Sequence, residues 1–216
     1  MLLAEEFVLL IFDGESGKRT LSFEKYGPPL GAALLVELTL MERVAVAPQS
    51  ASRRDRGRVT VTSTKPTDDS ELVRVLRLVE EKEGIHIGNL ISDISSTRVT
   101  KGLLERLLQR LVTAGVLVQS HTDVLGLRRW PTADWEARDE IRRRLQSCLV
   151  GGARPTERTA ALVSLLQVTD SLSTIVQPHD GVARRALRAR ARFLSDGDWA
   201  GAAVKAAIDD RVNGMG

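Results

Sequence analysis

Residues 160–175 place the strongest constraint on the fold, because they are almost entirely apolar over a length typical of a helix. Asp170 is the only charged residue among them. Thr156 precedes the segment as a good N-cap residue, so we predict a helix from Thr156 to Val176. A helix that is apolar on most sides is normally buried. The sequence therefore predicts a mainly α fold: a single globular domain over residues 1–216, with this central apolar helix surrounded by other helices and a few short β-hairpins.

Apolar residues at helical spacing predict further helices along the chain. Residues 3–12 come first; this run is too short for periodicity to distinguish a helix from a strand, and its start at Ala4-Glu5-Glu6 favours a helix. The next helices cover residues 30–41, 68–83, 100–114, 132–149 and 180–194, with a last helix capped by Asp198. Pro28 and Pro29 are expected at the N-terminus of the helix at residues 30–41. Asp68 and Glu71 resemble a capping box at the start of the helix at residues 68–83. Short strands are expected at residues 20–23, 44–46, 59–62, 116–118 and 124–127, while residues 84–99 form a short, mixed segment.

The cysteine content and the N-terminal segment indicate a cellular location. Cys148 is the only cysteine, so the chain has no internal disulfide, which suits a reducing compartment. The apolar run Phe7–Phe12 is too short to span a bilayer or to form the core of a signal peptide. Glu5 and Glu6 also stand where a signal peptide carries basic residues. We therefore expect a cytoplasmic protein, or one that is peripheral on the cytoplasmic face of a membrane.

The residues that carry most catalytic chemistry form no recognisable constellation. His86, His121 and His179 each fall in a predicted loop or irregular segment, without a second ligand at metal-binding spacing. The glycines match neither a phosphate loop nor a dinucleotide-binding fingerprint, and no GxSxG nucleophile elbow is present. Cys148 lies on the inward stripe of its predicted helix, as a core residue does. We predict no catalytic residues, no metal site and no cofactor.

Arginine dominates the positive charge, since the chain has 25 Arg and 6 Lys within a net charge of +3. A GC-rich genome explains such a bias, and recognition of phosphate groups is the functional alternative. Arg184, Arg188 and Arg192 recur every fourth residue and predict a basic face on one helix. Such a face is usually just solvated. It also attracts anionic lipid, by about 1 kcal/mol per basic residue near the surface, or nucleic-acid phosphates.

Two sequence blocks in order resemble the Golgi phosphoprotein 3 family. The first is LGAALLVELTLMERVAV at residues 30–46, preceded by EEFVLLIFDGESGK at residues 5–18, and the second is LLERLLQRLVTAGVL at residues 103–117. The late segment LVSLLQVTDSLSTIV agrees as well, so the resemblance covers almost the whole chain. It implies a mostly helical domain with a peripheral membrane or adaptor role. Eukaryotic members bind phosphatidylinositol 4-phosphate and link Golgi membranes to glycosyltransferase tails. The arginine bias points to a bacterial, actinobacterial member.

The resemblance also implies a lipid pocket between the starts of two predicted helices. The family's pocket has a Trp and an Arg near the helix at residues 30–41, and two basic residues three apart at the start of the helix at residues 100–114. The equivalent positions here are Glu24-Lys25-Tyr26 for the Trp region, Gly31 for the Arg, Lys101, which matches in type, and Leu104, which does not. The expected lipid-binding residues are Lys101, Arg98, Arg106 and Lys25. The implied partners are an anionic phospholipid or phosphoinositide membrane surface and a protein partner.

A DNA-binding regulator is the alternative from a different class. Residues 100–127, taken as helix, glycine, strand, turn and strand, also have the shape of a winged-helix element, and the sequence pI is near 9.3. The presumed recognition helix carries five leucines and no obvious set of base-reading side chains, so nucleic acid is the less favoured partner. Salt-sensitive binding to duplex DNA, compared with binding to anionic vesicles, separates the two hypotheses.

Overall fold

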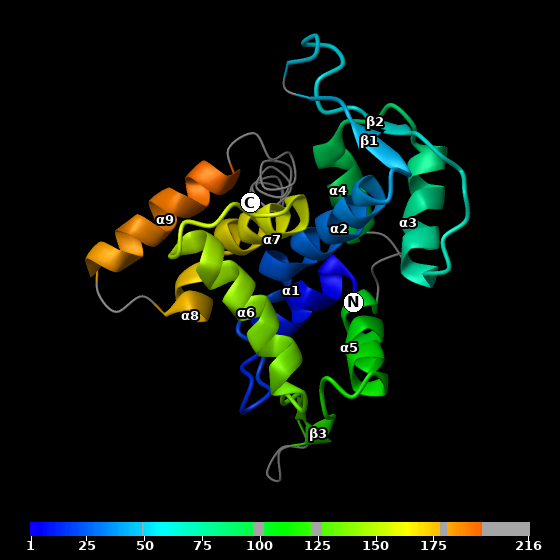
Figure 1. The fold of residues 1–216 in the computed structure, drawn as a ribbon. Helices are drawn as coiled ribbons and strands as arrows, with labels where there is room; N and C mark the ends of the chain where they lie inside the picture. Colours follow the sequence, from blue (N-terminus) through cyan, green and yellow to red (C-terminus); the bar gives the residue numbers. More distant parts are fainter. Residues whose placement is uncertain (49, 97–101, 122–126, 178–180, 196–216) are drawn as a thin grey trace, which may run out of the picture.

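The computed structural model describes residues 1–48, 50–96, 102–121, 127–177 and 181–195 (Figure 1). The helices within these ranges are α1 (Leu3–Ile11), α2 (Phe23–Leu40), α3 (Ser70–Glu81), α4 (Ile87–Ser96), α5 (Leu103–Thr113), α6 (Trp135–Leu149), α7 (Glu157–Val168), α8 (Leu172–Val176) and α9 (Gly181–Ser195). The strands are β1 (Val44–Val46) with β2 (Val59–Val61), and β3 (Ser120–His121) with β4 (Arg128–Arg129), each pair antiparallel. The mainly α prediction is confirmed.

Helix α1 is the most completely buried helix of the described part of the chain, because all nine of its residues are buried. It contacts α2, α5, α6 and α7 and lies near the middle of the molecule in Figure 1. The prediction that the helix from Thr156 to Val176 would be the most buried is therefore wrong in its choice of helix. A nine-residue helix that is buried on every side gains its stability from packing rather than from its own propensity.

The predicted helix from Thr156 to Val176 is two helices. Thr156 is the N-cap of α7 as expected, and its hydroxyl accepts from the Thr159 N–H at 3.2 Å. The chain leaves the helix at Asp170, which has a φ of 54°, so α8 starts in a new direction. The Thr169 hydroxyl donates to the Leu165 carbonyl at 3.1 Å and satisfies one of the groups freed at the end of α7. Both helices are apolar, so the apolar pattern continues through the break, and one helix was predicted from the sequence where the structure has two.

Helix α2 begins earlier than predicted, at Phe23, and Pro28 and Pro29 lie inside it rather than at its start. The expected strand at residues 20–23 is absent, and only an isolated bridge between Phe12 and Arg19 pairs this part of the chain. Both prolines are still close to the N-terminus of the helix. Their missing N–H groups therefore remove hydrogen bonds only to first-turn carbonyls, beside the exposed Lys25, where the loss costs least.

Four other features differ from the predicted ones. Residues 84–99 contain α4, whose buried Ile87, Leu90, Ile91 and Ile94 follow the i, i+3, i+4, i+7 pattern that marks an amphipathic helix. Asp69, not Asp68, caps α3 and accepts from the N–H groups of Glu71 and Leu72. Asp134, not Thr132, caps α6. The predicted strand at residues 116–118 is reduced to a bridge between Leu117 and Thr132. Residues 97–101, 124–126 and 196–216, with Thr100 and Asp198, lie outside the described residues.

Two buried acids on α1 and one half-buried acid on α2 are paired with arginines from later helices. Arg110 lies 2.7 Å from Glu5 and Arg144 lies 2.6 Å from Glu6. Arg158 lies 2.9 Å from Glu6 and 2.7 Å from Glu37. Burial lowers the pKa of Arg158, but hydrogen bonds to Glu37 and Glu6 outweigh it and the pKa is raised overall. We call Glu5, Glu6 and Glu37 with these three arginines the α1 ion-pair cluster.

A fourth arginine, Arg138, forms hydrogen bonds at the C-terminal end of α1. The last turn of α1 contains no basic residue of its own. Arg138 of α6 is buried and donates to the carbonyls of Leu9 and Phe12, the latter at 2.8 Å. Burial lowers the pKa of its guanidinium, and repulsion from Arg142 adds to this. The cation therefore satisfies the free carbonyls at the negative end of the helix dipole.

Candidate functional site

The start of α5 lies beside a recess of about 290 Å³ formed by four separate parts of the chain. They are the loop before α2, the first turns of α2, the end of α4 and the first turn of α5. The lining residues are Arg19, Tyr26, Gly27, Leu30, Ser95, Gly102, Leu103, Leu104 and Glu105. We call this site the α2–α5 recess. It brings together both helix starts that the family resemblance singled out.

Arg19 supplies a positive charge at the α2–α5 recess. Its guanidinium lies 4.9 Å from the centre of the Tyr26 ring, and Nη1 donates to the Tyr26 hydroxyl oxygen at 3.2 Å. A cation stacked on an aromatic ring keeps its charge while losing freedom of movement. No carboxylate within the described ranges forms an ion pair with Arg19. This cation is therefore held in place without being neutralised.

The first turn of α5 presents backbone N–H groups to the same recess. Gly102 is its N-cap, with a φ of 77° in the left-handed region that favours glycine, and no side chain of the described residues caps the helix there. The first N–H groups of a helix have no partner within the helix, and the N-terminus carries about half a positive charge. An 11-residue helix that begins in this way at a recess has the geometry of an anion-binding N-terminus.

Ser95 at the end of α4 adds a hydroxyl that has no partner. The residue is 4% exposed, and its Oγ makes no hydrogen bond to any described residue. Leaving a buried polar group unpaired costs about 1–3 kcal/mol. A ligand oxygen in the recess would remove that cost by accepting the hydroxyl proton.

Gly31, which aligns with the family's pocket arginine, has a packing role in this chain. It does not line the recess. A Cβ atom at this position would lie 3.0 Å from Cγ2 of Ile94 and 3.5 Å from Oγ of Ser95. The glycine therefore allows α2 to approach α4 closely. A larger side chain would push against the segment that carries Ser95.

One acid, Glu105, also lines the α2–α5 recess, and its charge is paired. Arg128 of β4 forms an ion pair with it. This pair connects the recess to the hairpin of β3 and β4, beside which Val118 and Leu127 are each about half exposed. The acid that lines the recess therefore has a basic partner on the neighbouring hairpin.

Two of the four residues predicted to bind lipid lie within the described part of the chain, and neither lines the α2–α5 recess. Lys101 and Arg98 lie outside the described residues. Lys25 is exposed and does not line the recess. Arg106 turns to α3, where Nε and Nη2 donate to the two carboxylate oxygens of Glu71 at 2.6 and 2.8 Å. This bidentate contact raises the pKa of Arg106 and fixes the side chain in the interface between α3 and α5.

Sequence analysis missed Arg19 and Ser95 as site residues. Arg19 belongs to a loop, so no helical period relates it to α5. Ser95 lies next to the last residue of α4, a helix that was not predicted from the sequence, so its burial was not expected. The only available signal was the match of Tyr26 to the family's aromatic region.

The predicted basic face is present on α9. Arg184, Arg188 and Arg192 are exposed along one side of a helix without acidic residues. Arg188 lies 3.2 Å from Asp170, with both side chains more than half exposed. An exposed pair of this kind contributes about 0–1 kcal/mol. The charge of this face is thus largely open to solvent.

The model of the Golgi phosphoprotein 3 (GPP34) family matches residues 3–211, and the chain therefore belongs to this family. A search of curated proteins gave no significant match. Within the described ranges, no helix is both long and apolar enough to cross a bilayer. In the same part of the chain, no three side chains of the types His, Cys, Asp and Glu are grouped so that they could hold a metal ion.

Proposed function

We propose that this chain is a peripheral membrane adaptor that binds the phosphorylated head group of an anionic phospholipid in the α2–α5 recess. One observation carries the proposal: three different anion-binding groups meet there. They are the guanidinium of Arg19, the uncapped N-terminus of α5 and the unpaired hydroxyl of Ser95. Membership of the Golgi phosphoprotein 3 family supports a membrane role, and phosphatidylinositol 4-phosphate is the first head group to test.

The size and surroundings of the recess suit a head group rather than a whole lipid. Its volume of about 290 Å³ lies at the lower end of the roughly 300–1,000 Å³ range of ligand pockets. Lys101 and Arg98 precede Gly102 closely in the sequence, and we propose that they add positive charge. Because Gly31 and Leu104 replace two basic family positions, we expect a preference for phosphorylated head groups in general over one inositol isomer.

Two other surfaces would strengthen attachment to a membrane. Val118 and Leu127, beside the β3–β4 hairpin, offer apolar side chains for shallow insertion next to the recess. The basic face of α9 would attract any anionic surface by about 1 kcal/mol per basic residue. These contributions do not depend on head-group identity, so they act in addition to the recess.

The alternative of a winged-helix DNA-binding protein has less support. Its recognition helix would be α5, and the basic residues on α5 are Arg106 and Arg110. Both form ion pairs with acids: Arg106 with Glu71, and Arg110 with Glu5 and Asp69 at 2.7 Å. Arginines held in this way are not placed to contact phosphates, on which affinity for nucleic acid largely depends.

Vesicle sedimentation tests the proposal with a matched pair of variants. Arg19→Glu changes a lining residue of the recess, and Arg154→Glu makes the same charge change at an exposed arginine away from it. We expect Arg19→Glu to weaken binding to phosphatidylinositol 4-phosphate vesicles roughly tenfold, about 1.4 kcal/mol, and Arg154→Glu to have a much smaller effect. Equal losses would contradict the recess as the site. An absence of binding to every anionic vesicle at low salt would overturn the membrane role.

A further inference from the structure

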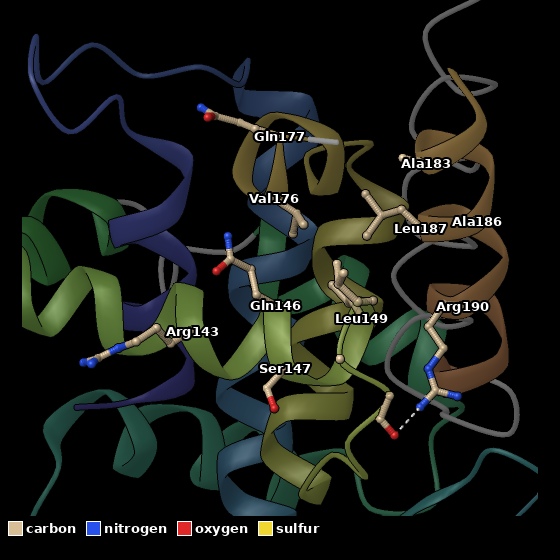
Figure 2. A pocket seen from close by; sticks show the side chains of 13 residues that line it. Arg143, Gln146, Ser147, Leu149, Val176, Gln177, Ala183, Ala186, Leu187 and Arg190 are labelled. Atoms are coloured by element: carbon tan, nitrogen blue, oxygen red, sulfur yellow. Dashed lines mark hydrogen bonds between the residues drawn. The ribbon is translucent and has the colours of Figure 1, made fainter. Parts of the chain in front are cut away.

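A second and larger depression lies between α6, α8 and α9, and shares no residue with the α2–α5 recess (Figure 2). Its volume is about 860 Å³. The apolar residues that line it are Leu149, Val150, Val176, Ala183, Ala186 and Leu187. We call it the α6–α9 groove. Figure 1 draws α9 and α5 apart from each other, with α6 between them.

Positive charge borders the α6–α9 groove, and none of the lining residues is acidic. Arg143 and Arg190 lie at its two sides in Figure 2. Arg190 is held by the carbonyls of Cys148, at 3.1 Å, and of Gly152 and Ala153, each at 3.4 Å. Arg143 pairs with Glu140 at 2.9 Å in an exposed contact, which contributes little. With the exposed arginines of α9 beside it, the groove is complementary to a negatively charged partner.

Apolar side chains extend beyond the groove into solvent. Val150 is 72% exposed and lines the groove, and Val182 is 64% exposed beside the lining residue Ala183. Phe193 is 71% exposed, with the guanidinium of Arg190 at 5.4 Å from its ring centre. Large apolar side chains that gather next to an apolar depression mark an interaction surface rather than scattered exposure.

Polar groups in the groove distinguish between two kinds of apolar occupant. The side chains of Gln146, Ser147 and Gln177 line it and make no hydrogen bond within the described part of the chain. A lipid acyl chain would cover them without offering a partner, at about 1–3 kcal/mol for each group that becomes buried. A peptide backbone offers both N–H and C=O groups. The groove therefore favours a protein segment over an acyl chain.

We infer that the α6–α9 groove binds a short amphipathic, acidic segment of a partner protein. Apolar side chains of the segment would lie against Leu149, Val176 and Leu187, as when a helix lies in a groove. Its acidic side chains would face Arg143, Arg190 and the arginines of α9. The inference rests on the proposed adaptor role, which requires a protein-binding surface separate from the lipid recess.

Peptide display tests this inference without lipid. Random peptides of about 12 residues are displayed and selected for binding to the full chain. This length is enough to span the i, i+3, i+4 and i+7 positions of a helix. We expect enriched peptides with apolar residues at this spacing and a net negative charge. Fluorescence anisotropy then gives their Kd for the full chain and for two variants, Ala186→Glu and Ala189→Glu. Both alanines are exposed on α9, but only Ala186 lines the groove.

The same substitution is expected to change the peptide Kd strongly at Ala186 and little at Ala189. Ala186→Glu should weaken binding roughly tenfold, which corresponds to about 1.4 kcal/mol, while Ala189→Glu should change it by less than about threefold, or 0.7 kcal/mol. Enrichment of basic peptides, no saturable binding, or equal losses with both variants would overturn the inference. So would a loss of vesicle binding specific to Ala186→Glu without any peptide binding, because the groove would then contact lipid. Arg19→Glu should leave peptide binding unchanged, so failure of the lipid proposal is detected separately.

Discussion

The arginines around α1 and the arginines on α9 belong to one residue type but have opposite environments. In the α1 ion-pair cluster, the side chain of Arg158 is 22% exposed and contacts two acids, Glu6 and Glu37. On α9, the side chain of Arg188 is 51% exposed and contacts one exposed acid, Asp170. The first group connects helices that are far apart in sequence, whereas the second leaves its charge on the surface.

The difference shows that the acids, rather than the arginines, decide which role each arginine has. Removing a charge from water is costly unless an opposite charge and good hydrogen bonds compensate for it. Glu6 is buried on a central helix and receives hydrogen bonds from Arg144 and Arg158. The α9 helix has no acid of its own and faces solvent. Only the surface arginines are therefore available to an anionic membrane or partner.

The largest expected effect comes from removing an acid of the α1 ion-pair cluster. Glu6→Ala leaves Arg144 without the acid it pairs with and leaves Arg158 with Glu37 alone, and breaking a buried pair costs about 3–5 kcal/mol. Urea unfolding should show this loss in the free energy of unfolding. Glu80→Ala, at an exposed acid of α3, is the control and should change it by less than about 0.5 kcal/mol. If Glu6→Ala lowers the free energy of unfolding no more than Glu80→Ala does, the arginines around α1 contribute no more to stability than exposed ones.

Reversal of the basic face should affect binding and leave folding intact. The triple change Arg184→Glu, Arg188→Glu and Arg192→Glu should weaken binding to anionic vesicles by about 3 kcal/mol, at roughly 1 kcal/mol for each basic residue removed. The loss should be equal for phosphoinositide and phosphatidylserine vesicles and should shrink as salt rises. The free energy of unfolding measured in urea should change little. Strong destabilisation would show that α9 also needs its arginines for folding.

A smaller and more selective effect is expected at Lys101. Lys101→Glu should weaken binding to phosphatidylinositol 4-phosphate vesicles roughly tenfold, or about 1.4 kcal/mol, and binding to phosphatidylserine vesicles less. The reason is its place in the sequence directly before Gly102, the N-cap of α5. Surface plasmon resonance on captured vesicles of both compositions measures the two affinities. If both fall equally, Lys101 acts like the arginines of α9.

The smallest expected effect has opposite signs for stability and binding. Ser95→Ala removes a buried hydroxyl without a partner and should raise the free energy of unfolding by about 1 kcal/mol. The same change should weaken binding to phosphatidylinositol 4-phosphate vesicles, because one donor to the head group is lost. Thermal unfolding and vesicle sedimentation measure the two quantities on one preparation. A variant that is less stable would show that Ser95 supports the fold and would remove it from the site.

Much of the fold could be predicted from local sequence patterns, and the errors of these predictions also have local causes. The apolar spacing correctly predicted α3, α5, α6 and α9 to within a few residues, since helical periodicity depends only on neighbours in sequence. The start at Ala4-Glu5-Glu6 correctly favoured a helix for α1, where periodicity alone could not decide. α4 was not predicted, although Ile87, Leu90, Ile91 and Ile94 carry the helical pattern. The apolar pattern also continues through Asp170, so one helix was predicted where this residue with positive φ separates α7 from α8. The site was less predictable, since it combines Arg19, Ser95 and the start of α5.

The sequence by itself determined the mainly helical class, the family, and the excess of arginine that makes an anionic partner reasonable. Those properties are readable from composition, periodicity and ordered blocks of residues. Only the tertiary structure decided which arginines are consumed by pairing: Arg158 meets Glu6 across 152 positions of the chain, and Arg106 meets Glu71 instead of lining a pocket. It also brought Arg19 and Ser95 to the N-terminus of α5. Contacts between distant residues depend on how helices pack, and no local pattern encodes them.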